Sequence, residues 1–220
     1  MTTSRRNFSL FTLSIVLAGP AAAQFGGLLG GSKSSGGDID ADVNSFLSQS
    51  LRIESTISKA ALAIVAAYQN ETERAQSQAA FDQISKTTNP KEAGANFQSV
   101  SESTDAALKK LTTSGDLAER TKTLSAEKQQ QVAKGVMNFL LGVLQSKELV
   151  SSGQSMMTKA SSNPMNLMKI VPVKDALPRL ANAASLAGST IPEFIKVLQG
   201  ANVKVEEVTA SSKPAEITSL

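Results

Sequence analysis

The methionine thioethers are the side chains in this sequence whose type and spacing come closest to a metal site. Met156, Met157, Met165 and Met168 lie within 13 residues of one another, and thioethers are soft ligands that select Cu(I). Such a site needs three converging sulfurs and is usually reinforced by His or Cys, neither of which occurs in this chain. Because methionine is also a common filler of apolar cores, we interpret this Met-rich stretch as core packing and predict no cofactor.

The other reactive residue types do not form a complete catalytic motif. The lack of Cys and His excludes disulfides, thiol nucleophiles, Cys or His zinc sites and serine triads with His. Ser125 and Lys128 have the Ser-x-x-Lys spacing of penicillin-binding enzymes, but the companion S-D-N and K-T-G motifs of those enzymes are absent. We therefore interpret Ser125 as a helix cap. An enzyme that uses carboxylates, Ser or Lys alone stays open as an alternative.

Three aspartates, Asp38, Asp40 and Asp42, have the D-x-D-x-D spacing that begins a calcium-binding loop. That loop requires Gly at its sixth position and Glu at its twelfth, and this sequence has Val43 and Gln49 there. Acidic side chains are also favoured in the first turn of a helix, because of the helix dipole. The aspartates therefore indicate the start of a helix, and we predict no metal site.

The charge balance gives no indication of nucleic acid binding. The chain has 22 basic and 19 acidic residues. Arg5 and Arg6 belong to an N-terminal segment that we expect to be removed, which leaves 20 basic and 19 acidic residues and a net charge of +1. Nucleic-acid-binding domains carry a marked excess of positive charge, so we predict no nucleic acid partner.

Residues 1–23 have the features of a secretory signal. Arg5 and Arg6 form a positive region, residues 8–19 are mainly apolar, and Ala21-Ala22-Ala23 form a small-residue cleavage site. The apolar stretch spans 12 residues, whereas a membrane-spanning helix needs roughly 20. We therefore expect cleavage after Ala23 and no stable transmembrane anchor.

The stretch Ser4-Arg5-Arg6-Asn7-Phe8 resembles the bacterial twin-arginine signal, in which S-R-R-x-F is followed by Leu and Lys. This chain has Ser9 and Leu10 at those last two positions, and an ordinary Sec signal that contains two arginines is the alternative. Either route implies that the mature protein is periplasmic or secreted. The absence of Cys is compatible with such an oxidising compartment.

Composition divides the rest of the chain into three parts. Residues 24–38 hold six glycines and three serines, which indicates a flexible linker. Residues 39–202 carry helical periodicity, and we expect them to form one helical bundle domain. Residues 203–220 lack that periodicity, and we expect an extended or disordered tail.

The spacing of apolar residues predicts an all-α fold. The expected long helices cover residues 40–86, residues 90–111, and residues 125 to 153 or 160. Shorter helices are expected at residues 164–171, 173–187 and 191–199, because prolines separate these segments. The predicted fold is an antiparallel helical bundle with two or three long helices and several short, Pro-broken C-terminal helices.

Small residues mark one face of each of the two most apolar predicted helices. Ala60, Ala63 and Ala67 recur at helical spacing in the first, and Gly135 and Gly142 lie seven residues apart in the other. A glycine inside a helix costs about 1 kcal/mol relative to alanine, so a pair on one face indicates a closely approaching neighbour. We expect the two faces to touch in the core; the alternative is that the glycines are tolerated without such a contact.

The C-terminal helices carry more apolar residues than one narrow stripe can bury. We predict a candidate binding surface there, at Met165, Met168, Ile191, Phe194 and Leu198, with burial in the core as the alternative. With the export signal and the lack of a catalytic motif, this surface predicts an exported non-catalytic protein that binds a protein partner in the cell envelope as a scaffold, adaptor or accessory subunit. A periplasmic carrier of a lipid or other apolar ligand is the second hypothesis.

Overall fold

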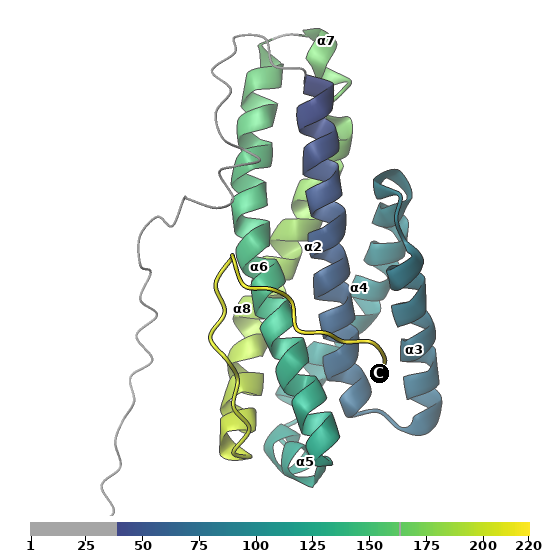
Figure 1. Cartoon of the computed structure of the whole chain (residues 1–220), viewed down its shortest axis with the longest axis vertical. Coiled ribbons are helices and arrows are strands. Elements are labelled where there is room, and N and C mark those ends of the chain that lie inside the picture. Colours follow the sequence, from purple (N-terminus) through teal and green to yellow (C-terminus); the bar gives the residue numbers. More distant parts are fainter. Residues whose placement is uncertain (1–38, 163) are drawn as a thin grey trace, which may run out of the picture. The chain divides into compact units, whose positions relative to one another are not determined.

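The computed structural model describes residues 39–162 and 164–220, which all belong to one compact unit (Figure 1). Its helices are α2 (Ile39–Ala67), α3 (Glu71–Lys86), α4 (Pro90–Thr113), α5 (Leu117–Thr123), α6 (Ala126–Ser161), α7 (Pro164–Leu167) and α8 (Val171–Gly200). The described residues contain no strand, so the predicted all-α helical bundle is confirmed. The expected export signal and the linker over residues 24–38 lie outside the described residues.

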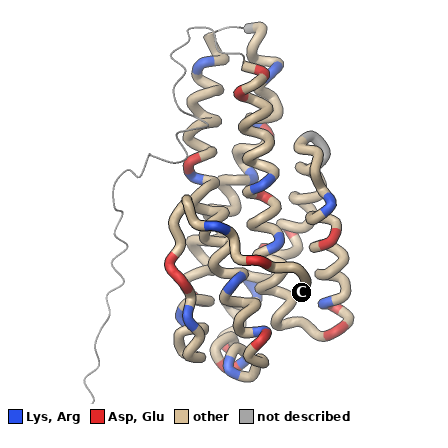
Figure 2. Tube along the Cα trace, viewed as in Figure 1, with Lys and Arg blue, Asp and Glu red and all other residues tan. Residues whose placement is uncertain are grey.

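The three longest helices, α2, α6 and α8, form the centre of the bundle. Figure 1 shows α6 running alongside α2 in the opposite direction, with α8 returning behind them. Their apolar faces meet in one core, whose largest fully buried side chains include Phe46, Phe139, Leu180 and Phe194. Lys and Arg are interspersed with Asp and Glu along the helices (Figure 2).

The glycines of α6 set how closely α2 approaches. A Cβ built on Gly135 would lie 2.7 Å from Ile64 Cγ1 and 3.0 Å from the carbonyl oxygen of Ala60. A Cβ on Gly142 would overlap the side chain of Ile57. Since the contacts on α2 move toward its N-terminus as α6 proceeds, the two helices are antiparallel.

The predicted alanine face of α2 lies inside the bundle. Ala60, Ala63 and Ala67 are all buried. Besides the contact of Ala60 with Gly135, the carbonyl oxygen of Ala63 accepts a hydrogen bond of 3.0 Å from Nε2 of Gln131 on α6.

The first predicted helix, residues 40–86, is in fact two helices. α2 ends at Ala67 and α3 begins at Glu71, because Asn70 caps the second helix. The Asn70 side chain accepts a hydrogen bond from the Glu73 backbone N–H at 3.0 Å, and the Glu73 carboxylate accepts one from the Asn70 N–H at 3.2 Å. This reciprocal capping box satisfies two backbone donors that the helix itself leaves unpaired.

The predicted breaks at the C-terminal prolines are wrong for residues 171–200. They form one continuous helix, α8, with Pro172 in its first turn and with Pro178 and Pro192 inside it. An internal proline removes one helical hydrogen bond. The buried side chains of α8 hold both parts of the helix against α2 and α6, and this packing outweighs the local cost.

A second apolar cluster holds the α3–α4 hairpin against α2. Phe81 and Ile84 of α3 pack there with Phe97 and Val100 of α4 and with Leu62 of α2. At the C-terminal end, residues 203–220 are extended apart from a turn at residues 210–211, and they pass over α6 toward α3 (Figure 1).

Candidate functional site

Four large apolar side chains are exposed where α7 leads into α8, and we call this group the apolar tip. Met165 and Met168 are 81% and 80% exposed, and Leu167 and Val171 are about half as exposed. Nζ of Lys169 donates a hydrogen bond of 2.6 Å to the Asp40 carboxylate, which ties the tip to the first turn of α2. Apolar groups gathered in water are typical of a surface that contacts another molecule.

The predicted binding surface is therefore divided by the structure. Met165 and Met168 belong to the apolar tip, whereas Ile191, Phe194 and Leu198 are fully buried. These three residues recur at helical spacing on the inner face of α8, and the centroid of the Phe194 ring lies 6.2 Å from that of the Tyr68 ring. Because α8 is continuous, it packs this stripe against the core, and these three residues are not available as a binding surface.

The interpretation of the Met-rich stretch as core packing holds for only half of it. Met156 and Met157, in the last turns of α6, are partly buried and pack against the main core. Met165 and Met168 are exposed, so that interpretation is wrong for them. Met165 lies in α7, a helix of 4 residues at the end of the bundle, and Met168 lies in the turn that follows it.

A groove of about 590 Å³ lies between α2, α4 and α8. Its apolar lining includes Ile57, Phe97 and Leu180, and its charged lining consists of Glu54, Glu102, Asp105, Lys174, Asp175 and Arg179. The groove therefore combines apolar side chains with six charged ones, and its volume lies in the usual range of small-molecule sites, about 300–1,000 Å³.

A partly buried ion pair crosses the groove from α8 to α2. Nε of Arg179 donates to Oε1 of Glu54 at 2.9 Å, and its Nη1 donates to the carbonyl oxygen of Asp175, also at 2.9 Å. Gly94 of α4 leaves room for the guanidinium, since a Cβ there would lie 3.3 Å from Nη1. Burial raises the pKa of Glu54 despite the opposing attraction of Arg179.

A second carboxyl in the groove, that of Asp105, has a raised pKa for the same reason. Asp105 is half-buried, and the loss of hydration outweighs the attraction of Lys109 and a 3.4 Å hydrogen bond from the Ser101 hydroxyl. A carboxyl whose pKa is raised by burial gains from a cationic partner that restores its lost solvation.

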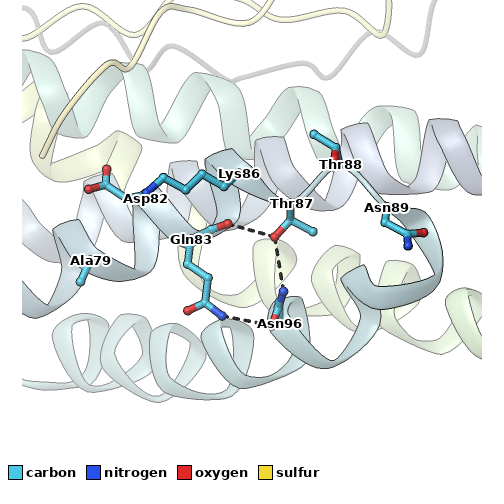
Figure 3. Close-up of a pocket in the computed structure, with 8 residues that line it drawn as sticks. All are labelled: Ala79, Asp82, Gln83, Lys86, Thr87, Thr88, Asn89 and Asn96. Carbon is cyan, nitrogen blue, oxygen red and sulfur yellow. Dashed lines mark hydrogen bonds between the residues drawn. The ribbon is translucent and has the colours of Figure 1, made fainter.

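A polar pocket of about 560 Å³ at the turn between α3 and α4 has a structural explanation (Figure 3). Gln83 donates to the Asn96 side chain at 3.1 Å, Asn96 donates to the Thr87 hydroxyl at 3.4 Å, and that hydroxyl donates to the Gln83 carbonyl oxygen at 2.9 Å. These side chains use their hydrogen-bonding groups on one another and join the two helices. We therefore assign them a role in the stability of the α3–α4 hairpin.

Sequence reasoning missed the Glu54–Arg179 pair. The two residues are 125 positions apart, and no local pattern links them. A usable signal existed in Glu54 alone, because it is an acid placed between Ile53 and Ile57 on the apolar stripe of α2. A charge in such a stripe requires a partner when the helix is buried.

The comparisons with known proteins found no matching family model, no matching curated protein and no matching solved structure. Among residues 39–162 and 164–220, no helix is both long and apolar enough to cross a membrane.

Proposed function

We propose that this chain is an exported, non-catalytic binding protein that serves as a scaffold, adaptor or accessory subunit of a bacterial envelope assembly. The observation that carries the proposal is the apolar tip, where Leu167, Met168 and Val171 expose apolar surface at one end of the bundle. Exposed apolar groups gain free energy when a partner covers them, at roughly 25 cal/mol for each Å² removed from water. A partner protein with a complementary apolar surface fits this tip.

The N-terminal sequence supports an envelope location. Arg5, Arg6 and the small residues that end at Ala23 form the expected export signal, and the Gly- and Ser-rich segment that follows would act as a spacer before the bundle. N-terminal sequencing of the exported protein should begin at Gln24.

The test of partner binding is the substitution Met168→Asp, which places a charge in the tip without touching the core. Ala181→Asp is the matched control, because it adds the same charge at an exposed position of α8, away from the tip. The native chain and Ala181→Asp should both capture a partner protein from an envelope extract. Met168→Asp should fail to capture it. Equal capture by all three chains would contradict a role for the tip.

A second candidate function is a periplasmic carrier of an apolar ligand, which the α2–α4–α8 groove favours. The groove has the volume of a small-molecule site and an apolar floor at Ile57, Phe97 and Leu180. Native mass spectrometry of protein purified from its own source should then show a bound small molecule. Ala183→Asp, at a partly exposed position of the groove wall, measured beside the exposed control Ala181→Asp, should release that mass; retention of the mass in folded Ala183→Asp would exclude the groove.

A further inference from the structure

The C-terminal segment, residues 209–220, is held to the helices through its backbone. In the part of the chain that the structure describes, five hydrogen bonds join this segment to α3 and α6, and each uses a backbone atom of the segment. They link Gln145 to the Ala210 carbonyl (3.1 Å), Asn138 to both the N–H and the carbonyl of Ala215 (2.7 and 2.8 Å), Lys134 to the Glu216 carbonyl (3.5 Å) and Gln78 to the Leu220 N–H (2.8 Å). These five hydrogen bonds are independent of the side chains of the segment.

Asn138 is the centre of this attachment. It is 5% exposed and is the polar residue in an otherwise apolar stretch of α6. Its Nδ2 donates to the Ala215 carbonyl and its Oδ1 accepts from the Ala215 N–H, so its amide pairs with the peptide as a neighbouring β-strand would. A buried amide without such a partner is costly, and Asn138 is therefore built to receive an extended backbone.

The segment is a lightly packed occupant of this surface rather than part of the core. Beyond Val203, every described tail residue is partly or fully exposed, and only Ile217 and Leu220 pack against the α2–α3–α4 cluster. Two hollows remain between the tail and α6, of about 450 Å³ near Ile217 and about 240 Å³ near Asn138.

We propose that the α6 surface around Asn138 and Gln145 is a binding site for an extended peptide, occupied in cis by residues 209–220 and able to take the same segment of a second copy of this chain. The bound segment has a small residue, Ala215, over Asn138 and apolar residues two and five positions later, Ile217 and Leu220. The second copy is the fitting partner because it supplies this pattern and the same backbone contacts. This site is separate from the apolar tip and does not depend on the proposed function.

The test uses a fluorescent peptide with the sequence of residues 209–220 and two full-length chains. One chain is native, and the other carries Ile217→Asp and Leu220→Asp, which weaken the tail anchors without changing α6. Because the native tail competes for the site, the peptide should bind the weakened chain at least tenfold more tightly. Adding Asn138→Leu to the weakened chain should abolish that binding.

Two modified peptides make the test independent of the fold of any variant. N-methylation at the position of Ala215 removes the N–H that donates a hydrogen bond to Oδ1 of Asn138. This change should lower the affinity of the peptide at least tenfold. Replacing the exposed Lys213 of the peptide by Ala should leave the affinity unchanged. Equal binding of the N-methylated and unmodified peptides, or equal affinity for the native and weakened chains, would overturn the proposal.

Tail exchange between full-length native chains has its own readout. Sedimentation at rising concentration should show a monomer–dimer equilibrium that Asn138→Leu shifts toward the monomer. A native chain that stays monomeric at every concentration tested would overturn the assignment of a second copy as the partner.

Discussion

Gly142 of α6 lies so close to Ile57 of α2 that a Cβ at position 142 would overlap the Ile57 side chain. Helical glycines are ordinarily replaced by alanine with a gain in stability of about 1 kcal/mol. Here the steric contact reverses the sign, because Ile57 is buried and cannot move away without disturbing the core.

We therefore predict that Gly142→Ala lowers the free energy of unfolding by about 1–3 kcal/mol, and that Gly142→Leu lowers it further. The matched control is Gly188→Ala in α8, where a Cβ would meet no atom within 4 Å; this change should stabilise by about 0.5–1 kcal/mol. Denaturant unfolding measures both. A stabilising Gly142→Ala would show that α2 and α6 are not in close contact there.

The raised pKa of Glu54 predicts a pH dependence of stability. Burial makes the folded chain hold the Glu54 proton to a higher pH than the unfolded chain, whose pKa is near 4.5. As pH rises from 4.5 through the folded pKa, the native chain should therefore lose stability relative to Glu54→Gln, which cannot ionise. The free energies of unfolding of the two chains are measured across this pH range. Asp105 titrates in both chains, so the difference between them reports Glu54. A difference that stays constant with pH would contradict the raised pKa.

Removal of Arg179 should destabilise the chain more when Glu54 is present than when it is absent. Arg179→Met leaves a carboxyl that is 8% exposed without its ion-pair partner. Loss of one member of a fully buried pair costs about 3–5 kcal/mol; since the Arg179 side chain is 28% exposed, we expect about 1–3 kcal/mol.

A double-mutant cycle isolates this interaction. In the Glu54→Gln background, Arg179→Met should cost less, because no buried charge is left behind. The free energies of unfolding of the four chains give the coupling directly. Equal costs in both backgrounds would show that Arg179 contributes only through packing.

Met168→Asp should leave the fold intact and Phe194→Asp should disrupt it, although both residues were predicted to lie on one binding surface. Met168 is 80% exposed, so Met168→Asp should change the free energy of unfolding by no more than about 0.5 kcal/mol. Phe194 is fully buried, so Phe194→Asp places an unpaired carboxylate in the core and should unfold the chain. Thermal melts followed by circular dichroism would distinguish the two, and similar melting temperatures would contradict the division of the predicted surface.

Local pattern was sufficient to predict the fold class and most helix positions. Apolar residues at helical spacing predicted α6, and Ser125 was expected to cap it; its hydroxyl does accept a hydrogen bond from the Lys128 N–H. The break at Asn70 was also present in the sequence as a capping box with Glu73, but the apolar spacing that continues into α3 concealed it. Signals of this kind are readable because each involves residues within about one or two helical turns.

Tertiary structure decided the features that could form a site. The prolines of α8 predicted breaks, yet long-range burial of residues such as Phe194 keeps the helix continuous and removes them from the predicted surface. Glu54 meets Arg179 across 125 residues, and Asn138 meets Ala215 across 77. The sequence shows that a buried acid and a buried amide need partners, but the partner is chosen by how the helices pack. That packing depends on the free energy of the whole core, and no single segment of the sequence carries a local signal for it.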